Sequence, residues 1–130
     1  MITIPKKVEY SVLLISNLAQ NPDKTTSLRE VSKKTALPYR FLGQLASYLK
    51  QGGVLESKEG VGGGYRLKAG WRDKSFYDLL VILEEDKHLV TCLNPNGKCV
   101  RMGKCSMQKI WGDLEKTFIR ELQALKLSSV

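Results

Sequence analysis

The sequence predicts a mainly helical fold with a small β wing: a winged helix-turn-helix domain followed by a long C-terminal helix. Three observations predict this fold class. Two short segments with helical spacing of apolar residues flank a turn at residues 36–38. A glycine-rich hairpin follows them at residues 54–67. A long apolar stripe with helical spacing then begins near residue 104.

A helix is expected before the helix-turn-helix pattern. Apolar residues recur at helical spacing from Val8 to Leu18, and the sequence NPDK at 21–24 ends that helix. Ser27 and Glu30 have the spacing of a capping box, in which each side chain binds the other residue's backbone N–H. They predict a second helix that ends near residue 35.

A third helix is predicted over residues 38–51. Pro38 stands at or near its first position, and Gly52 and Gly53 stop it. Two short helices joined by a tight turn form the outline of a helix-turn-helix, with an ordinary helical bundle as the alternative. The residues expected to face inward on the third helix are Phe41, Leu42, Leu45, Ala46 and Leu49.

The hairpin after this helix is interpreted as a wing. Strands are predicted at 54–57 and 65–67, around the sequence KEGVGGG. The segment lacks the G-K-[ST] signature and does not open a helix, which excludes the common nucleotide-binding loops. Its glycines would instead let the backbone approach a DNA phosphate or the minor groove.

The second half of the chain predicts a dimerisation helix. A capping pattern at 75–78 begins a helix that ends at the acidic residues 84–86, and a longer helix is expected from about residue 104. Its stripe is too long and apolar for one small domain to cover, so we expect a homodimer whose two-fold symmetry matches palindromic DNA. A helix folded back on its own domain is the alternative. The stripe comprises Met107, Ile110, Trp111, Leu114, Phe118, Leu122 and Leu125.

The positive charge is concentrated in the first half of the chain. Residues 1–74 carry 13 Lys and Arg against 6 Asp and Glu, whereas residues 75–130 carry 8 against 7. Clustered basic residues favour a polyanionic partner such as double-stranded DNA, although a solvated basic face gives the same count. The chain contains no apolar run long enough to span a membrane, and its first residues do not resemble a secretory signal. We therefore expect a cytoplasmic protein without membrane association.

All three cysteines lie in one loop. Cys92, Cys99 and Cys105 are spaced C-x6-C-x5-C among glycines, a proline and basic residues. An odd number of cysteines in a cytoplasmic protein argues against a structural disulfide, and zinc sites usually contain closely spaced C-x-x-C pairs. Soft thiolates in a mobile loop suit an iron–sulfur cluster, while a zinc site, a redox-active thiol and coincidence are the alternatives.

Together these motifs resemble a known family, the winged-helix regulators of the IscR/NsrR type, and the chain is nearer the IscR branch. The resemblance extends from VEYSVLLISNLAQ through SLREVSKKTALPYRFLGQLASYLKQGGVLESKEGVGGGYRL to the cysteine loop and WGDLEKTF. It implies a DNA-binding transcriptional repressor that acts as a homodimer, senses iron–sulfur cluster status and controls genes for cluster biogenesis. The implied domains are a winged helix-turn-helix at 1–74, and a cluster-binding loop with a dimerisation helix at 75–130.

The resemblance also implies the cluster ligands. Cys92, Cys99 and Cys105 fall on the family's ligand positions, with [2Fe–2S] the expected cluster and [4Fe–4S] the alternative. The fourth ligand is expected to be Glu9 of the partner subunit, then Gln108, which stands where one branch has a histidine. His88 is the last candidate and is expected to be a solvated surface residue.

The resemblance also implies the DNA contacts, and the sequence departs from the family's pattern at two of these positions. Glu59 stands where relatives often have a minor-groove arginine, and Gly43 replaces a glutamate that affects base choice in some relatives. Arg40 and Gln44 remain as side chains that read guanine and adenine edges. The predicted DNA-binding residues are Ser27, Pro38, Tyr39, Arg40, Gln44, Lys58, Gly62, Gly63, Arg66 and Lys68.

Functions of other classes fit the sequence less well. An enzyme or electron carrier that uses the cluster lacks support, because the chain has one histidine and neither a nucleophile motif nor a cofactor fingerprint. Regulators of the same fold that sense nitric oxide, redox state or a metabolite, the last without a cluster, remain alternatives.

Overall fold

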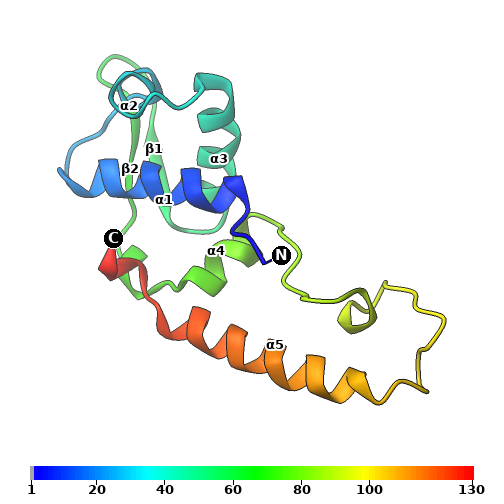
Figure 1. Ribbon diagram of the computed structural model, residues 1–130. Coiled ribbons are helices and arrows are strands. Elements are labelled where there is room, and N and C mark those ends of the chain that lie inside the picture. Colours follow the sequence, from blue (N-terminus) through cyan, green and yellow to red (C-terminus); the bar gives the residue numbers. More distant parts are fainter. Residues whose placement is uncertain (1) are drawn as a thin grey trace.

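The computed structural model describes residues 2–130 and confirms the predicted fold class. Five α-helices and one two-stranded antiparallel sheet make up its regular elements (Figure 1). Helices α1–α3 and the sheet form one body, α4 lies beneath it, and α5 runs below α4 toward a long loop at one end (Figure 1). Within the described residues, no helix is sufficiently long and apolar to cross a bilayer.

Helix α1, Lys6–Ala19, begins two residues before the apolar pattern indicated. Pro5 precedes it, and the two lysines that follow form a polar first turn, which an apolar pattern cannot detect. Its inner face contributes Val8, Leu14, Ile15 and Leu18 to the core.

Helices α2, Leu28–Thr35, and α3, Tyr39–Gln51, form the predicted helix-turn-helix. Ser27 caps α2 by accepting a hydrogen bond from the Glu30 backbone N–H at 3.2 Å. The reciprocal half of the capping box is absent, because the Glu30 carboxylate pairs with Lys24 and Lys34 instead. These hydrogen bonds, first from Lys24 and then from Lys34, lower the pKa of the Glu30 carboxyl.

The turn between these helices positions the start of α3. Ala36 ends α2 in the left-handed conformation, at a φ of 59°. Pro38 is extended and precedes the helix, so α3 begins one residue later than predicted.

The wing consists of β1, Leu55–Lys58, and β2, Gly64–Leu67, with Leu55 opposite Leu67. Strand β1 begins and ends one residue later than predicted, and β2 begins one residue earlier than predicted. The backbone of Tyr65 exchanges hydrogen bonds of 2.8 and 2.9 Å with Thr26, which joins the wing to the segment before α2. Gly64 makes this approach feasible, since a Cβ there would lie 2.3 Å from the Thr26 carbonyl oxygen.

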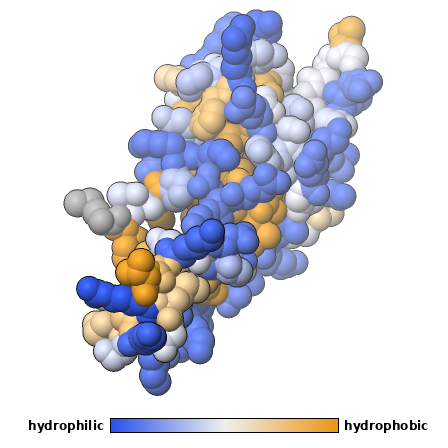
Figure 2. Space-filling view, turned by 90° about the vertical axis from the view of Figure 1, so that its right-hand side faces the viewer, coloured by the Kyte–Doolittle hydropathy of each residue, from blue (hydrophilic) through white to orange (hydrophobic). Residues whose placement is uncertain are grey.

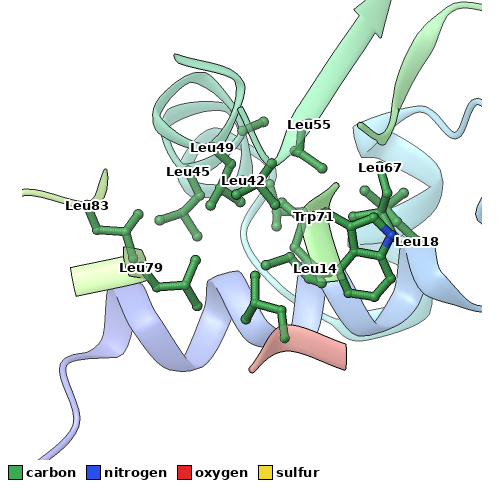
Figure 3. Close-up of a cluster of buried hydrophobic side chains, with 14 of the residues drawn as sticks. Leu14, Leu18, Leu42, Leu45, Leu49, Leu55, Leu67, Trp71, Leu79 and Leu83 are labelled. Carbon is green, nitrogen blue, oxygen red and sulfur yellow. The ribbon is translucent and has the colours of Figure 1, made fainter. Parts of the chain in front are cut away.

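One apolar core joins α1, α3, the base of the wing and α4, Phe76–Ile82 (Figure 3). Leu42, Leu45 and Leu49 enter it from α3, and Leu79 enters it from α4. The capping box predicted at the start of α4 is present in both halves, between Ser75 and Asp78. This core fixes the orientation of α3 relative to the rest of the chain.

The chain after α5, Met107–Ala124, folds back onto the winged-helix body. The Phe76 backbone N–H donates to the Leu125 carbonyl at 2.9 Å, and the Leu127 N–H donates to the Lys74 carbonyl at 2.8 Å. The Leu127 side chain is fully buried in the core. We call residues 125–130 the C-terminal hook; sequence periodicity did not predict it, and it fixes the end of α5.

Replacing Leu127 with alanine should lower the free energy of unfolding by about 2–5 kcal/mol, the usual cost of truncating a buried leucine. Urea denaturation followed by circular dichroism measures this change. Leu125→Ala is the matched control, because that side chain is 44% exposed and its structural contact is made by the backbone. Equal losses of stability in the two variants would show that burial of the Leu127 side chain does not hold the hook in place.

Candidate DNA-binding face and cysteine loop

The exposed face of α3 is polar and carries the two predicted base-reading residues. Arg40 and Gln44 lie on this face, while Leu42 and Leu45 point into the core. Arg40 and Gln44 line one shallow groove together with Lys7 and Tyr48. A Cβ on Gly43 would meet no atom within 4 Å, so nothing covers the helix between the two polar side chains.

The other predicted DNA contacts on the helices lie near the turn. Pro38 and Tyr39 are exposed at the start of α3, and the Tyr39 side chain is in contact with Arg29 of α2. Ser27 is half-buried at the start of α2. Sequence reasoning missed Arg29, because its contact with Tyr39 spans the turn and leaves no periodic signal.

The wing offers fewer free cations than predicted. Arg66 forms an ion pair with Glu56 across the two strands. Lys58 and Lys68 are exposed and form no ion pair within residues 2–130. These two lysines are therefore the better candidates for phosphate contacts.

Glycines shape the tip of the wing. Gly60 and Gly62 have φ values of 90° and 73°, a region that favours glycine. They flank Val61, which is fully exposed, while Gly63 packs close to the carbonyl oxygen of Lys58. From Gly60 to Gly63 the tip therefore presents backbone and one apolar side chain, and the exposed carboxylate of Glu59 precedes this segment.

The three cysteines line one pocket of about 340 Å³ beside the start of α5. Cys92 lies in a short helical turn, Thr91–Leu93, and Cys105 lies two residues before α5. Cys99 is exposed between them, and all three are free thiols. In the described part of the chain no three His, Cys, Asp or Glu side chains converge as a metal-binding group. Thiolates are donors that suit iron, but the three thiols share the pocket without being gathered around one point.

The candidate fourth ligands occupy different places. Gln108 lines the cysteine pocket, whereas Glu9 and His88 do not. Glu9 is exposed in the first turn of α1, where it accepts a 2.7 Å hydrogen bond from Lys6. That hydrogen bond raises the pKa of the Lys6 ammonium group.

The expectation that His88 is a solvated surface residue is wrong. Its Nδ1 lies 3.0 Å from Oε1 of Glu115, and the two side chains are only 18% and 12% exposed. The second oxygen of Glu115 accepts the backbone N–H of Leu89 at 2.9 Å. Glu115 is the one buried side chain of α5, so this cluster attaches the beginning of the cysteine loop to the middle of that helix. An apolar pattern could not reveal it, because the buried residue is a carboxylate.

The apolar stripe on α5 is only partly covered by its own chain. Phe118 and Leu122 pack toward α4 and the core, while Ile110 and Leu114 are 52% and 47% exposed. Figure 2 views the molecule from the side of the cysteine loop and shows apolar surface among the hydrophilic residues nearest the viewer. The fold-back alternative thus accounts for Phe118 and Leu122, and it leaves Leu125 and the N-terminal half of the stripe open.

Comparisons with known proteins agree with this architecture. The Rrf2 family, described as iron-dependent transcriptional regulators, matches residues 4–130. The regulator IscR of Vibrio vulnificus is 26% identical over 128 residues, which cover 98% of this chain and 76% of that protein. CymR, the global cysteine regulator of B. subtilis, superimposes with a TM-score of 0.78 at 22% identity, covering 99% of this chain and 98% of CymR. IscR of T. potens has a TM-score of 0.75 at 23% identity and covers 98% and 84% of the two chains.

Proposed function

The chain belongs to the Rrf2 family of transcriptional regulators, and we propose that it binds a pseudo-palindromic operator as a homodimer and senses iron–sulfur cluster status through its cysteine loop. The genes it represses would include those for cluster biogenesis. The observation that carries the proposal is that all three thiols line one pocket at the start of α5. The far end of that helix is fixed to the DNA-binding body by the C-terminal hook.

The proposed DNA complex places α3 in the major groove. Arg40 and Gln44 are exposed there, and their side chains match the donor and acceptor patterns of guanine and adenine. Lys58 and Lys68 would contact phosphates on either side of the wing, with the backbone of Gly62 and Gly63 close to the minor groove. Two copies of this face would read two half-sites.

The proposed ligands are Cys92, Cys99 and Cys105, with Glu9 of the partner subunit as the fourth. A [2Fe–2S] cluster is favoured over [4Fe–4S]. When bound, it would react with oxygen or nitric oxide, or change its oxidation state. A carboxylate is a harder donor than a thiolate, so the position held by Glu9 would be the more exchangeable one. Gln108, which lines the pocket of the same chain, is the alternative fourth ligand.

A physical connection supports the coupling of the loop to DNA binding. The loop begins at the His88–Glu115 contact on α5. Just before it, Lys7 of α1 pairs with Glu85 at 3.5 Å and lies over the ring of Tyr48 on α3. A rearrangement of the loop would therefore pull on α5 and on the segment that touches the recognition helix.

A thiol-based regulator without a cluster is the second candidate. The observation that favours it is the exposed Cys99, since an accessible thiol that follows Lys98 and lies two residues before Arg101 is open to oxidation. This candidate predicts a colourless protein whose DNA affinity responds to peroxide, whether or not iron is supplied.

The DNA-binding part of the proposal is tested with Arg40→Ala and Lys68→Ala. The Arg40 change should cost about 1–3 kcal/mol on a duplex selected from a random pool, and much less on unselected DNA. The Lys68 change should weaken binding to both duplexes alike, because a phosphate contact carries no sequence information. Fluorescence anisotropy at fixed salt measures both. Equal losses of the Arg40 variant on selected and unselected DNA would exclude α3 as the base-reading helix.

A further inference from the structure

We infer that Arg29 of α2 is a phosphate-contacting residue of the DNA interface, held in its binding position by the ring of Tyr39. This inference rests on the proposed DNA-binding function and adds to it a preorganised contact formed by two side chains. The observation behind it is a guanidinium–ring contact across the helix-turn-helix, with the Arg29 Cζ 4.9 Å from the centroid of the Tyr39 ring.

The contact is formed on the outer surface of the helix pair. Arg29 is exposed in the first turn of α2, and Tyr39 is 47% exposed at the first position of α3. Arg40, the proposed base-reading residue, is the next residue along the chain. The Arg29–Tyr39 pair therefore lies beside the N-terminal end of the recognition helix, where the DNA backbone would border the major groove.

The charge of Arg29 is not compensated. Within residues 2–130 it takes part in no ion pair and no side-chain hydrogen bond. The nearest carboxylate in sequence, Glu30, is engaged by Lys24 at 3.1 Å and by Lys34 at 3.3 Å. Arg29 is thus a free cation, whereas Lys34 on the same helix is paired.

The geometry favours a phosphate over a base edge. In a helix-turn-helix the first helix crosses the DNA backbone while the second enters the groove, and Arg29 is on the first. The Arg29 guanidinium lies over the Tyr39 ring and donates no hydrogen bond within residues 2–130, so its N–H groups are available to bind a phosphate in a bidentate manner. Restricting the side chain before binding reduces the entropy lost on binding.

The test measures DNA affinity as a function of salt for the full chain. Arg29→Ala is expected to weaken selected and unselected duplexes alike, by about fivefold per subunit at about 0.15 M salt. The slope of log affinity against log salt should fall in magnitude by about 0.9 per subunit. Lys34→Ala removes the same charge from the same helix and should leave the slope unchanged. Thermal melting confirms that each variant is folded.

A double-mutant cycle tests the part played by Tyr39. Tyr39→Leu should lower affinity by about two- to fivefold in the presence of Arg29, and should have no further effect in the Arg29→Ala background. Tyr39→Phe keeps the ring, so it should lose less affinity than Tyr39→Leu and should keep the coupling to Arg29. Losses that multiply in the double variant, or a Tyr39→Phe loss as large as that of Tyr39→Leu, would overturn the positioning role.

The failure of this inference differs from the failure of the proposed function. If the unaltered chain binds a selected duplex but Arg29→Ala keeps the full salt slope, or loses affinity on the selected duplex alone, Arg29 is not a phosphate contact. If the unaltered chain binds no duplex at any salt concentration, the DNA-binding proposal itself is wrong.

Discussion

Replacing Leu114 with glutamate is expected to convert the proposed dimer into a monomer and to lower operator affinity by about two orders of magnitude or more. Leu114 is 47% exposed in the single chain, in the same open stretch of α5 as Ile110. A partner subunit packed on this stretch would bury the new carboxylate without a counter-ion, at a cost that a helix interface cannot offset. Each subunit binds one half-site of the operator. A monomer would therefore lose the affinity that the dimer gains by binding both half-sites at once.

Gln123→Glu is the matched control for this change. It introduces the same charge on the same helix at an exposed position nine residues further along, which places it on the opposite face. The control should remain dimeric in analytical ultracentrifugation and bind the operator normally. A dimeric Leu114→Glu variant would show that α5 is not the dimer interface, and a monomeric unaltered chain would exclude the homodimer.

Serine at any of the three cysteines should abolish the visible absorbance of protein purified without oxygen. Each cysteine is a proposed ligand, and the hydroxyl of serine binds iron far more weakly than a thiolate does. Val100→Ser is the control in the same loop, because this side chain is fully exposed and does not line the cysteine pocket. Retention of full absorbance after loss of Cys99 would remove that residue from the ligand set.

The same measurement identifies the fourth ligand. Glu9→Ala should leave the fold and the dimer intact, yet shift the visible spectrum and speed the loss of absorbance in air. Gln108→Ala should have little effect on either. An unchanged spectrum and lifetime for the Glu9 variant, together with loss in the Gln108 or His88 variant, would reassign the ligand.

The regular elements could be predicted from the sequence because their signals are local. The apolar spacing of α3, the serine before α2 and the glycines of the wing each act within a few residues. Predicted boundaries were wrong by one or two residues at Lys6 and Pro38, where a polar first turn or an extended proline decided them. Helix α4 ends at Ile82, before the acidic residues 84–86 where its end was predicted, and α5 begins at Met107, three residues after the predicted start.

The contacts that organise the site are not local and were missed. His88 and Glu115 are 27 residues apart, and the hook places Leu127 against a core built largely by residues 8–83. Arg29 meets Tyr39 through the turn geometry rather than through periodicity. By contrast, the grouping of the three cysteines in one loop of the sequence anticipated that they line one pocket, as the structure places them.

The most direct test of the proposed function compares DNA affinity before and after iron removal from one oxygen-free preparation. Visible absorbance and iron and sulfide content establish the loading, and a ferrous chelator in oxygen-free buffer then removes the metal. We predict about one cluster per subunit, and a change of about tenfold or more in affinity for the selected duplex, with little change on unselected DNA. A colourless protein from iron-replete cells, or a loaded protein whose affinity for the selected duplex stays constant through iron removal, would contradict the proposal.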